Sequence, residues 1–231
     1  EGGTPHQLTS GDFNHGGTLS FTRDGAEILF SANRNKDWEL QSRESDIFAV
    51  NVETGALRQL TSDPGTESSP QVSPDGRRVA YLKTANTPVP FLATNVHIMA
   101  LDGTAQRNLT GGLDRRAGSA QWLSNSEITY TFQNRGENFV GAVSLGGKRR
   151  TAAEKIGGTT VGRPYVSGTF DAGSGSALVY TKGSATRPAD LYAMVKGREV
   201  RLTALNEDLL ARRELGDLRS FTYNSSLDGL E

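Results

Sequence analysis

The 231-residue sequence contains no cysteine, only three histidines and no long apolar segment. Without cysteine there is no disulfide framework, and no thiolate can act as a nucleophile or a metal ligand. No apolar run approaches the roughly 20 residues that a membrane-spanning helix needs. Because a large domain needs no disulfides, the absence of cysteine leaves the compartment open between the periplasm and the cytoplasm, which we slightly favour.

An excess of charge of one sign is also missing, since the sequence has 25 Lys and Arg residues and 26 Asp and Glu residues. The composition therefore gives no electrostatic support for binding nucleic acid or an anionic membrane. The small basic clusters are dispersed, and we interpret them as solvated residues of hairpins: Arg77-Arg78, Arg115-Arg116 and Lys148-Arg149-Arg150. The chain begins with Glu1-Gly2-Gly3 and has no signal-peptide pattern, so we expect a processed product or an excised piece of a longer protein.

What the sequence does contain is a repeat. A Leu-Thr pair is followed by a short apolar segment, a polar turn, a segment with an aromatic residue and a third apolar segment. The aromatic residues recur about every fifty positions, at Phe30, Tyr81, Tyr130 and Tyr180. A period of about fifty residues with about four strands per unit is typical of β-propeller blades, so the predicted fold is all-β: a partial propeller of about four four-stranded blades with TolB/WD40-like repeats.

The alternation of apolar and polar residues places four strands, a to d, in each unit. We expect strand a at 18–21, 70–73, 120–123 and 164–167, and strand b at 27–30, 78–81, 127–130 and 177–180. Strand c is expected at 46–50, 95–99 and 190–194 with a degenerate copy near 139–143, and strand d at 57–61, 106–110, 149–151 and 200–203. Asp24-Gly25 and Asp75-Gly76 supply tight a–b turns. Leu8-Thr9 resembles the last strand of a fifth blade.

The pattern changes after Thr203. Residues 206–216 predict one short helix, with Asn206 as the N-cap, Glu207 and Asp208 in the first turn, and Gly216 at the left-handed C′ position. A strand-like segment, 219–223, follows.

Few residues suggest chemistry. No G-x-S-x-G nucleophile motif occurs, and we interpret Gly173-Ser174-Gly175-Ser176 as a flexible insertion. His97 aligns with Phe48 and Tyr192 and is expected to pack, while His6 and His15 have no ligand spacing. We therefore predict no catalytic residue, no metal site and no cofactor within the chain. The loop arginines Arg135, Arg163 and Arg187 could meet a peptide carboxylate, although a surface or strand-pairing role is favoured.

Several phrases together resemble a known family. Ser73-Pro74-Asp75-Gly76 followed by Val79-Ala80-Tyr81 is similar to the repeat shared by TolB-type propellers and the prolyl oligopeptidase (S9) family. Segments 157–165, 186–192 and 202–210 resemble the last blade and exit helix of bacterial acylaminoacyl-peptidase and dipeptidyl-peptidase relatives, and segment 221–231 resembles the start of their α/β-hydrolase domain.

This resemblance implies later propeller blades over residues 1–204, and over 205–231 an exit helix and linker into an α/β-hydrolase domain that lies outside the chain. The Ser-Asp-His triad of such a peptidase would lie beyond Glu231. The implied function is a non-catalytic, gating and substrate-selecting propeller of a serine peptidase that cleaves short or N-blocked peptides. Its implied partners are the hydrolase domain, N-terminal blades and short peptides, with no nucleic acid and no membrane. We also expect the chain alone to self-associate through uncovered blade faces. The alternative is a stand-alone TolB-like propeller that binds a protein or peptide.

Overall fold

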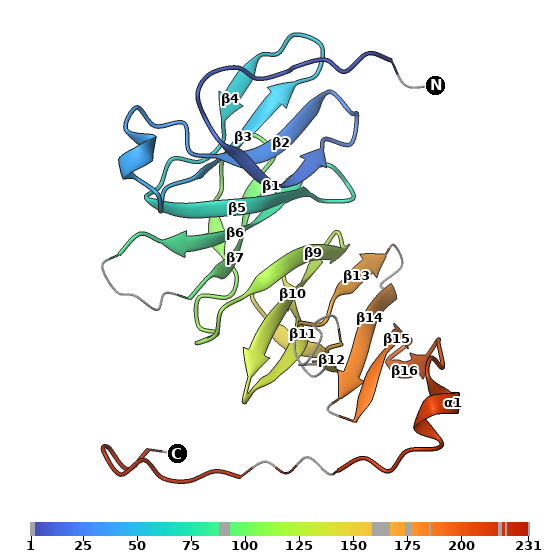
Figure 1. Ribbon diagram of the computed structural model, residues 1–231. Helices are drawn as coiled ribbons and strands as arrows, with labels where there is room; N and C mark the ends of the chain where they lie inside the picture. Colours follow the sequence, from blue (N-terminus) through green and yellow to red (C-terminus); the bar gives the residue numbers. More distant parts are fainter. Residues whose placement is uncertain are drawn as a thin grey trace.

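The computed structural model describes residues 3–87, 93–158, 167–173, 177–184, 186–216, 219 and 221–230. These residues form four antiparallel sheets of four strands each, which follow one another in chain order (Figure 1). Each sheet is ordered as its strands occur in the sequence, so that each is one propeller blade. The prediction of an all-β, partial propeller with four blades is confirmed, and the sheets do not close into a ring.

The blade boundaries are as follows. Blade 1 contains β1 (His15–Phe21), β2 (Glu27–Ala32), β3 (Asp46–Asn51) and β4 (Leu57–Gln59), and blade 2 contains β5 (Gly65–Val72), β6 (Arg78–Ala85), β7 (Asn95–Ala100) and β8 (Arg107–Asn108). Blade 3 contains β9 (Gly118–Ser124), β10 (Glu127–Asn134), β11 (Glu137–Ser144) and β12 (Arg149–Ile156). Blade 4 contains β13 (Phe170–Gly173), β14 (Ala177–Ser184), β15 (Arg187–Val195) and β16 (Arg198–Arg201). A 3-10 helix, η1 (Trp38–Leu40), and one α-helix, α1 (Glu207–Leu210), complete the described elements.

The hydrophobic core consists of layers between successive blades. One cluster joins blades 1 and 2, a second joins blades 2 and 3, and a third joins blades 3 and 4. Side-chain hydrogen bonds also link neighbouring inner strands. The Val72 N–H donates to Ser20 Oγ over 3.0 Å, and Trp122 Nε1 donates to the Gln71 carbonyl over 2.9 Å. The blades are therefore held side by side as neighbouring units of one array.

The Asp-Gly turns between the first two strands of blades 1 and 2 are stabilised by the same hydrogen bonds. Thr22 Oγ1 donates to Asp24 Oδ1 over 2.6 Å, and Ser73 Oγ donates to Asp75 Oδ1 over 2.6 Å. These bonds, together with a backbone N–H bond in each turn, lower the pKa of both aspartates below the ordinary value. The following glycine adopts φ of +73° in blade 1 and +75° in blade 2, which a residue with a Cβ rarely adopts.

The recurrent Leu-Thr pair has a structural role at the end of the fourth strand. The leucine N–H of Leu60 bonds the Ile47 carbonyl over 2.8 Å, and Oγ1 of the following Thr61 accepts the Ile47 N–H over 2.9 Å. The pairs Leu109-Thr110 and Leu202-Thr203 make the same two bonds to the third strands of blades 2 and 4. The threonine hydroxyl therefore replaces a ladder bond where the fourth strand ends.

The recurrent aromatic residues pair across the second and third strands of their blades. Phe30 lies opposite Phe48 with ring centroids 5.8 Å apart, and Tyr81 lies opposite His97 at 5.4 Å. The prediction that His97 packs in an aromatic position is confirmed. In blade 3, Tyr130 lies opposite Gly141, where a Cβ would come within 2.6 Å of the tyrosine ring.

Several expectations about individual segments are wrong. The third copy of strand c is not degenerate, because β11 pairs with β10 along eight residues. The inner strand of blade 4 is β13 and not the expected segment 164–167. Residues 164–166 lie outside the described residues, and Ser167 forms only an isolated bridge with Gly157. Leu8-Thr9 forms no strand, and Leu8 instead packs against the outer face of blade 1.

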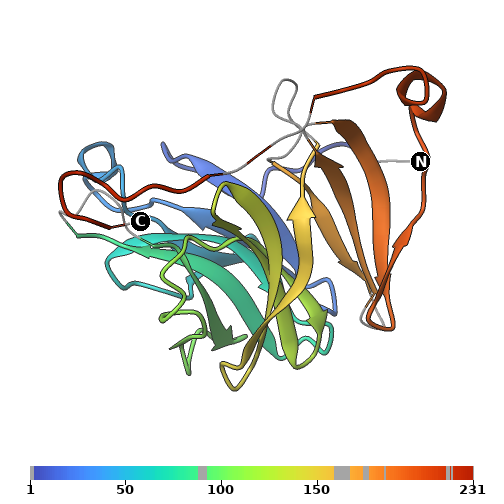
Figure 2. The same ribbon diagram turned by 90° about the horizontal axis from the view of Figure 1, so that it is seen from below.

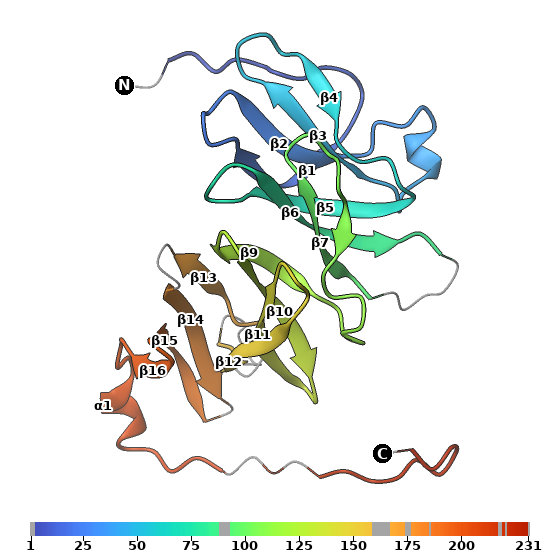
Figure 3. The same ribbon diagram turned by 180° about the vertical axis from the view of Figure 1, so that it is seen from behind.

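The C-terminal expectations also need correction. Helix α1 has four residues and ends far before Gly216, and none of its residues is buried, so no packing supports a longer helix. Asn206 occupies the N-cap position, where its carbonyl accepts the Leu210 N–H over 2.9 Å, but its φ is +63° and its side chain makes no capping hydrogen bond. The described residues of the segment 219–223 form no strand. Beyond α1 the chain extends below the sheets (Figures 1 and 3).

Candidate functional site

The connections of the four blades gather at two ends. Because each blade is antiparallel with its strands in chain order, the turns between second and third strands and the connections between blades lie at one end, which we call the b–c end. The a–b and c–d turns lie at the opposite end. Turns at the b–c end vary in length and sequence from blade to blade, as binding loops on a rigid scaffold do.

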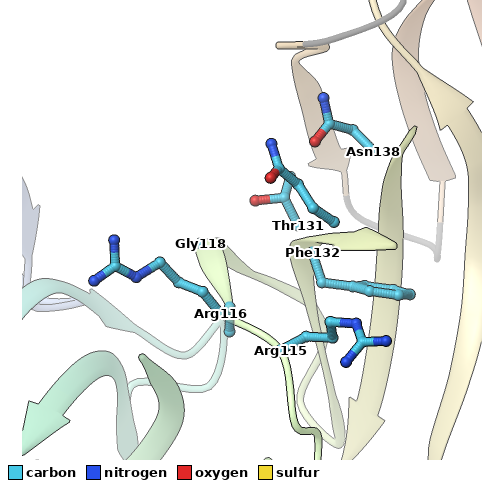
Figure 4. Close-up of a pocket in the computed structure, with 8 residues that line it drawn as sticks. Arg115, Arg116, Gly118, Thr131, Phe132 and Asn138 are labelled. Atoms are coloured by element: carbon cyan, nitrogen blue, oxygen red, sulfur yellow. The ribbon is translucent and has the colours of Figure 1, made fainter. Parts of the chain in front are cut away.

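A cavity of about 520 Å³ lies at the b–c end of blade 3. The connection from blade 2 contributes Arg115, Arg116 and Ala117, β9 begins with the lining residue Gly118, and the facing ends of β10 and β11 contribute further residues. The complete lining is Arg115, Arg116, Ala117, Gly118, Thr131, Phe132, Gln133 and Asn138. Figure 4 shows Arg115 on the same side as the Phe132 ring and Arg116 pointing to the other side of the loop. The cavity therefore combines cationic, amide and hydroxyl groups with one aromatic ring.

The two arginines differ in their partners. Arg115 Nη1 lies 3.2 Å from Asp114 Oδ2, and Arg115 Nη2 donates to Asn134 Oδ1 over 3.3 Å. Arg116 is exposed and makes no side-chain hydrogen bond or ion pair with any described residue. An unpaired guanidinium has its five N–H donors available for a ligand. Arg116 is therefore the residue of this cavity that is most able to accept an anionic group.

The three arginines singled out from the sequence have different outcomes. Arg135 is exposed in the turn between β10 and β11, next to Asn134, which Arg115 contacts, so Arg135 lies beside the cavity without lining it. Arg187 lies at the b–c end of blade 4. Arg163 lies outside the described residues.

Arg187 belongs to an ion-pair network. Its Nη1 lies 2.6 Å from Glu207 Oε1, and Arg201 binds both Glu207 and the fully buried side chain of Asp190. Burial would raise the pKa of Asp190, but hydrogen bonds from the Leu205 N–H, Arg201 and Thr203 outweigh burial and hold that pKa below its ordinary value. Glu207 thus anchors the segment around α1 to blade 4, and it lies in the first turn of the helix as expected.

A second cavity, of about 570 Å³, lies at the b–c end over blades 1 and 2, and its lining includes Glu44 and Asp46. These carboxylates already have partners: Glu44 accepts the Gly65 N–H over 2.8 Å, and Asp46 accepts Gln59 Nε2 over 3.0 Å. Burial, followed by the charges of Glu67 and Glu44, raises the pKa of Asp46 to about 6.

Other groups considered from the sequence form no reactive site. Of the insertion at 173–176, only Gly173 is described. His15 lies in β1 with its Nε2 2.7 Å from Arg34 Nη1, and burial and that charge lower its pKa. Among the described residues, no cluster of three or more His, Cys, Asp or Glu side chains could hold a metal ion. No helix in the described part of the chain has the length and apolar character to cross a membrane.

The sequence analysis did not place Arg115 and Arg116 at a cavity. It treated them as solvated residues of a hairpin, and they are indeed exposed. They lie, however, in the connection between two blades rather than in a hairpin. The signal that could have identified them is a difference between repeats. Arg115 and Arg116 come directly before the inner strand of blade 3, and the segment directly before the inner strand of blade 2, Ser62-Asp63-Pro64, contains no arginine.

The comparisons with known proteins agree with this architecture. The family model described as the dipeptidyl peptidase IV (DPP IV) N-terminal region matches residues 1–90 and 22–134, which together span more than half of the chain. The sequence matches no curated protein.

Among solved structures, acylaminoacyl peptidase of Pyrococcus horikoshii is 20% identical with a TM-score of 0.65, and the match covers 88% of this chain and 29% of that one. Oligogalacturonate lyase of Vibrio parahaemolyticus is 14% identical with a TM-score of 0.60, covering 84% and 55% of the two chains. TolB of Acinetobacter baumannii is 17% identical with a TM-score of 0.55, covering 82% and 43%.

At these identities the structures establish the fold alone, and the chain spans no more than 55% of the length of these three proteins. The same fold also serves a lyase and TolB, so function must be argued from the site. The family match and the succession of four-stranded blades lead to one assignment. The chain belongs to the family of the dipeptidyl peptidase IV N-terminal region, the β-propeller region of S9-type serine peptidases.

Proposed function

We propose that this chain is the non-catalytic, substrate-selecting propeller region of a serine peptidase that cleaves short or N-blocked peptides. In this proposal residues 1–204 supply propeller blades, and residues 205–231 lead into an α/β-hydrolase domain that carries the Ser-His-Asp chemistry. The observation that carries the proposal is the unpaired Arg116 beside Arg115 at a cavity of the b–c end. The cavity holds the carboxylate of a peptide while the hydrolase domain acts on its backbone.

The chemistry of the cavity suits a peptide carboxylate. A guanidinium presents a planar fork that binds both oxygens of a carboxylate, and such charge-assisted bonds are about twice as strong as neutral ones. Thr131, Gln133 and Asn138 add hydroxyl and amide groups that can bond a peptide backbone, and Phe132 adds an apolar surface for a side chain. A cavity of about 520 Å³ accommodates a few residues of flexible peptide and cannot accommodate a folded domain.

Binding to the 231-residue chain tests the carboxylate site directly. The probes are an N-acetylated alanine tripeptide with a free C-terminal carboxylate, its C-terminal amide, and the amide with a central aspartate, with affinity measured by calorimetry. We expect Arg116→Ala to weaken carboxylate binding at least about tenfold. The matched control is Arg77→Ala, an exposed arginine at the opposite end. The free acid and the aspartyl amide separate recognition of a C-terminus from recognition of an acidic side chain. Equal binding of all three probes, or no effect of Arg116→Ala, would contradict the site.

The peptidase assignment has its own test. A longer chain that contains the hydrolase domain is assayed on aminoacyl, dipeptidyl and N-acetyl-aminoacyl chromogenic substrates. Arg116→Ala should raise KM for peptides with a carboxylate and leave kcat nearly unchanged, because the group binds substrate outside the reacting atoms. Inactivity of the parent on all three substrate classes would refute the assignment.

The second candidate is a stand-alone TolB-like propeller that binds a protein or peptide partner. Its support is the fold similarity to TolB of Acinetobacter baumannii, with a TM-score of 0.55. The coding sequence after Glu231 separates the two functions. A nucleophile motif followed by Asp and His in hydrolase order supports the peptidase, and a stop codon within a few codons supports the binding module.

A further inference from the structure

One buried side chain at the cavity of blade 3 has no partner among the described residues. Asn138, the second residue of β11, lines the cavity and is 7% exposed. Its amide makes no hydrogen bond with any described residue, and neither amide atom is sealed from solvent. Every other buried polar side chain in the described part of the chain has a hydrogen bond or an ion pair, as buried polar groups normally do. The Asn138 amide is therefore an exception that opens into the cavity.

In the preceding blades, the residue at this position bonds within the fold. Ser45 in blade 1 and Thr94 in blade 2 are equivalent to Asn138, since each stands three residues before the third-strand residue that pairs with the recurrent aromatic. Ser45 Oγ donates to the Glu67 carbonyl over 2.7 Å, and Thr94 Oγ1 lies 2.7 Å from Thr84 Oγ1. Asn138 has a larger side chain with more hydrogen-bonding groups than either, and it lacks such a bond. The repeat does not account for it.

Asn138 lies beside two other polar side chains that line the cavity. Gln133 is directly opposite Asn138 in β10, and Thr131 is two residues before Gln133 on the same face of the sheet. Neither side chain makes a hydrogen bond with a described residue. Figure 4 shows Asn138 and Thr131 on one side of β10 and the Phe132 ring on the other. One face of blade 3 thus presents three neighbouring polar side chains that the described fold leaves unpaired.

Packing gives no reason for an amide at this position. Val140 and Ala142 continue the same face of β11, and both are 0% exposed in the core between blades 3 and 4. Figure 2 shows these two blades as neighbours in the array. An apolar residue at position 138 would extend that core, whereas a buried amide without a partner destabilises the fold. Buried polar groups of this kind are found where a site is built to hydrogen-bond a ligand.

The chemistry of the amide indicates which ligand group it would bind. The Asn138 side chain offers two N–H donors at Nδ2 and an acceptor at Oδ1. In an extended peptide the N–H and the C=O of one residue point to the same side, as they do in a hydrogen-bonded pair of antiparallel strands. A single amide side chain can therefore accept that N–H and donate to that C=O. A carboxylate would use the donors alone and leave Oδ1 unpaired.

We propose that Asn138 binds the main-chain N–H and C=O of one residue of an extended peptide, so that the site requires an unsubstituted main-chain amide there. Oδ1 accepts the peptide N–H, and Nδ2 donates to the peptide C=O. The contact selects for an extended backbone and is independent of the peptide side chains. This inference deepens the proposed function and rests on the same cavity.

Strand register indicates where on the peptide this contact falls. Thr131 in β10 pairs with Gly118 of β9 on one side and with Val140 of β11 on the other. Arg116 precedes Gly118 by two residues, as Asn138 precedes Val140, so the two backbones are about two strand spacings, or roughly 10 Å, apart. This separation equals about three residues of extended peptide. A peptide whose carboxylate lies at Arg116 therefore places one of its last few residues at Asn138.

Calorimetry on the 231-residue chain tests the contact with an N-acetylated alanine tripeptide and three ester analogues. In each analogue lactate replaces one alanine, so that one main-chain N–H becomes an ester oxygen. We expect one analogue to bind about tenfold more weakly than the tripeptide. Asn138→Leu should weaken binding of the tripeptide by a similar factor and should bind the tripeptide and that analogue equally, because the acceptor of the N–H is gone. The matched control is Asn125→Leu, an exposed asparagine in the a–b turn of the same blade, which should leave binding unchanged.

Urea unfolding distinguishes a ligand contact from a structural role. Asn138→Leu should unfold at the same or a higher urea concentration, because the amide has no partner among the described residues. A lower urea midpoint together with unchanged binding would show a structural role and overturn the proposal. An ester analogue that keeps its tenfold loss in Asn138→Leu would also overturn it.

The variants Asn138→Leu and Arg116→Ala separate this inference from the carboxylate site. If Arg116→Ala weakens binding of the tripeptide and Asn138→Leu does not, the carboxylate site holds and the inference is refuted. If only Asn138→Leu weakens binding, the inference holds and the carboxylate site is refuted. Absence of binding for every probe would refute both.

Discussion

Replacing the hydroxyl of Thr61 tests whether the recurrent Leu-Thr pair stabilises the blades through its threonine. Thr61 Oγ1 accepts the Ile47 N–H over 2.9 Å, and the two residues are 2% and 0% exposed. Valine has nearly the same shape but no acceptor, so Thr61→Val leaves the Ile47 N–H buried and unpaired. An unsatisfied buried donor costs about 1–3 kcal/mol, and the added apolar methyl group offsets up to about 1 kcal/mol of that cost. The expected net loss in unfolding free energy is therefore about 1–2 kcal/mol.

The assay is urea unfolding followed by circular dichroism, with thermal unfolding as a second measurement. A loss of this size should lower Tm by about 2–4 °C per kcal/mol. Thr18→Val, an exposed threonine of β1, is the control and should change stability by less than about 0.5 kcal/mol. Thr110→Val should repeat the loss in blade 2, where Oγ1 accepts the Val96 N–H over 2.8 Å. If Thr61→Val is as stable as the unmodified chain, the hydroxyl does not replace a ladder bond.

Three further changes test particular features. Burial and neighbouring acids raise the pKa of Asp46 to about 6, whereas burial, with a smaller effect of Lys83, lowers that of His97 to about 4. As pH rises from 4 to 6, the Asp46 contribution to stability is lost and the His97 contribution is gained. Relative to the unmodified chain, the slope of unfolding free energy against pH, measured by urea unfolding, should therefore be more positive for Asp46→Asn and more negative for His97→Phe. Slopes equal to that of the unmodified chain would contradict this. Gly103→Ala should lower the unfolding free energy by more than about 1 kcal/mol, because its Cβ would lie 2.5 Å from the Leu60 carbonyl oxygen. Gly197→Ala is the control: it lies in the same turn of blade 4 with open space around it, and it should lower the unfolding free energy by less in the same assay.

The sequence predicted the blades well where residues are buried on alternating faces. All four expected b strands lie within β2, β6, β10 and β14, because their apolar residues enter the layers between blades. The inner strand of blade 4 was misplaced because β13, Phe170–Gly173, has only one large apolar residue. The helix was overextended because the pattern of acids and arginines suggested capping, whereas Glu207 forms ion pairs with residues of blade 4.

The candidate site could be predicted only in part. The sequence indicated that loop arginines are the groups suited to a carboxylate, and Arg135 lies beside the cavity. It could not indicate which loops meet, because the cavity joins residues 115–118 to residues 131–138 through the pairing of β9, β10 and β11. A local pattern contains no information on such contacts until the register of the strands is known.

Recurring and non-recurring polar residues have different functions in this array. The recurring ones are occupied by the backbone: Asp24 and Asp75 hold their turns, and Thr61 and Thr110 accept strand N–H groups. A side chain whose hydrogen-bonding groups are already paired with the backbone has few groups left to bind a ligand. Arg116 has no equivalent in the preceding repeat and no partner among the described residues. In a repeat protein, a charged residue that the repeat does not require is therefore the place to look for ligand specificity, and this reasoning selects the b–c end of blade 3.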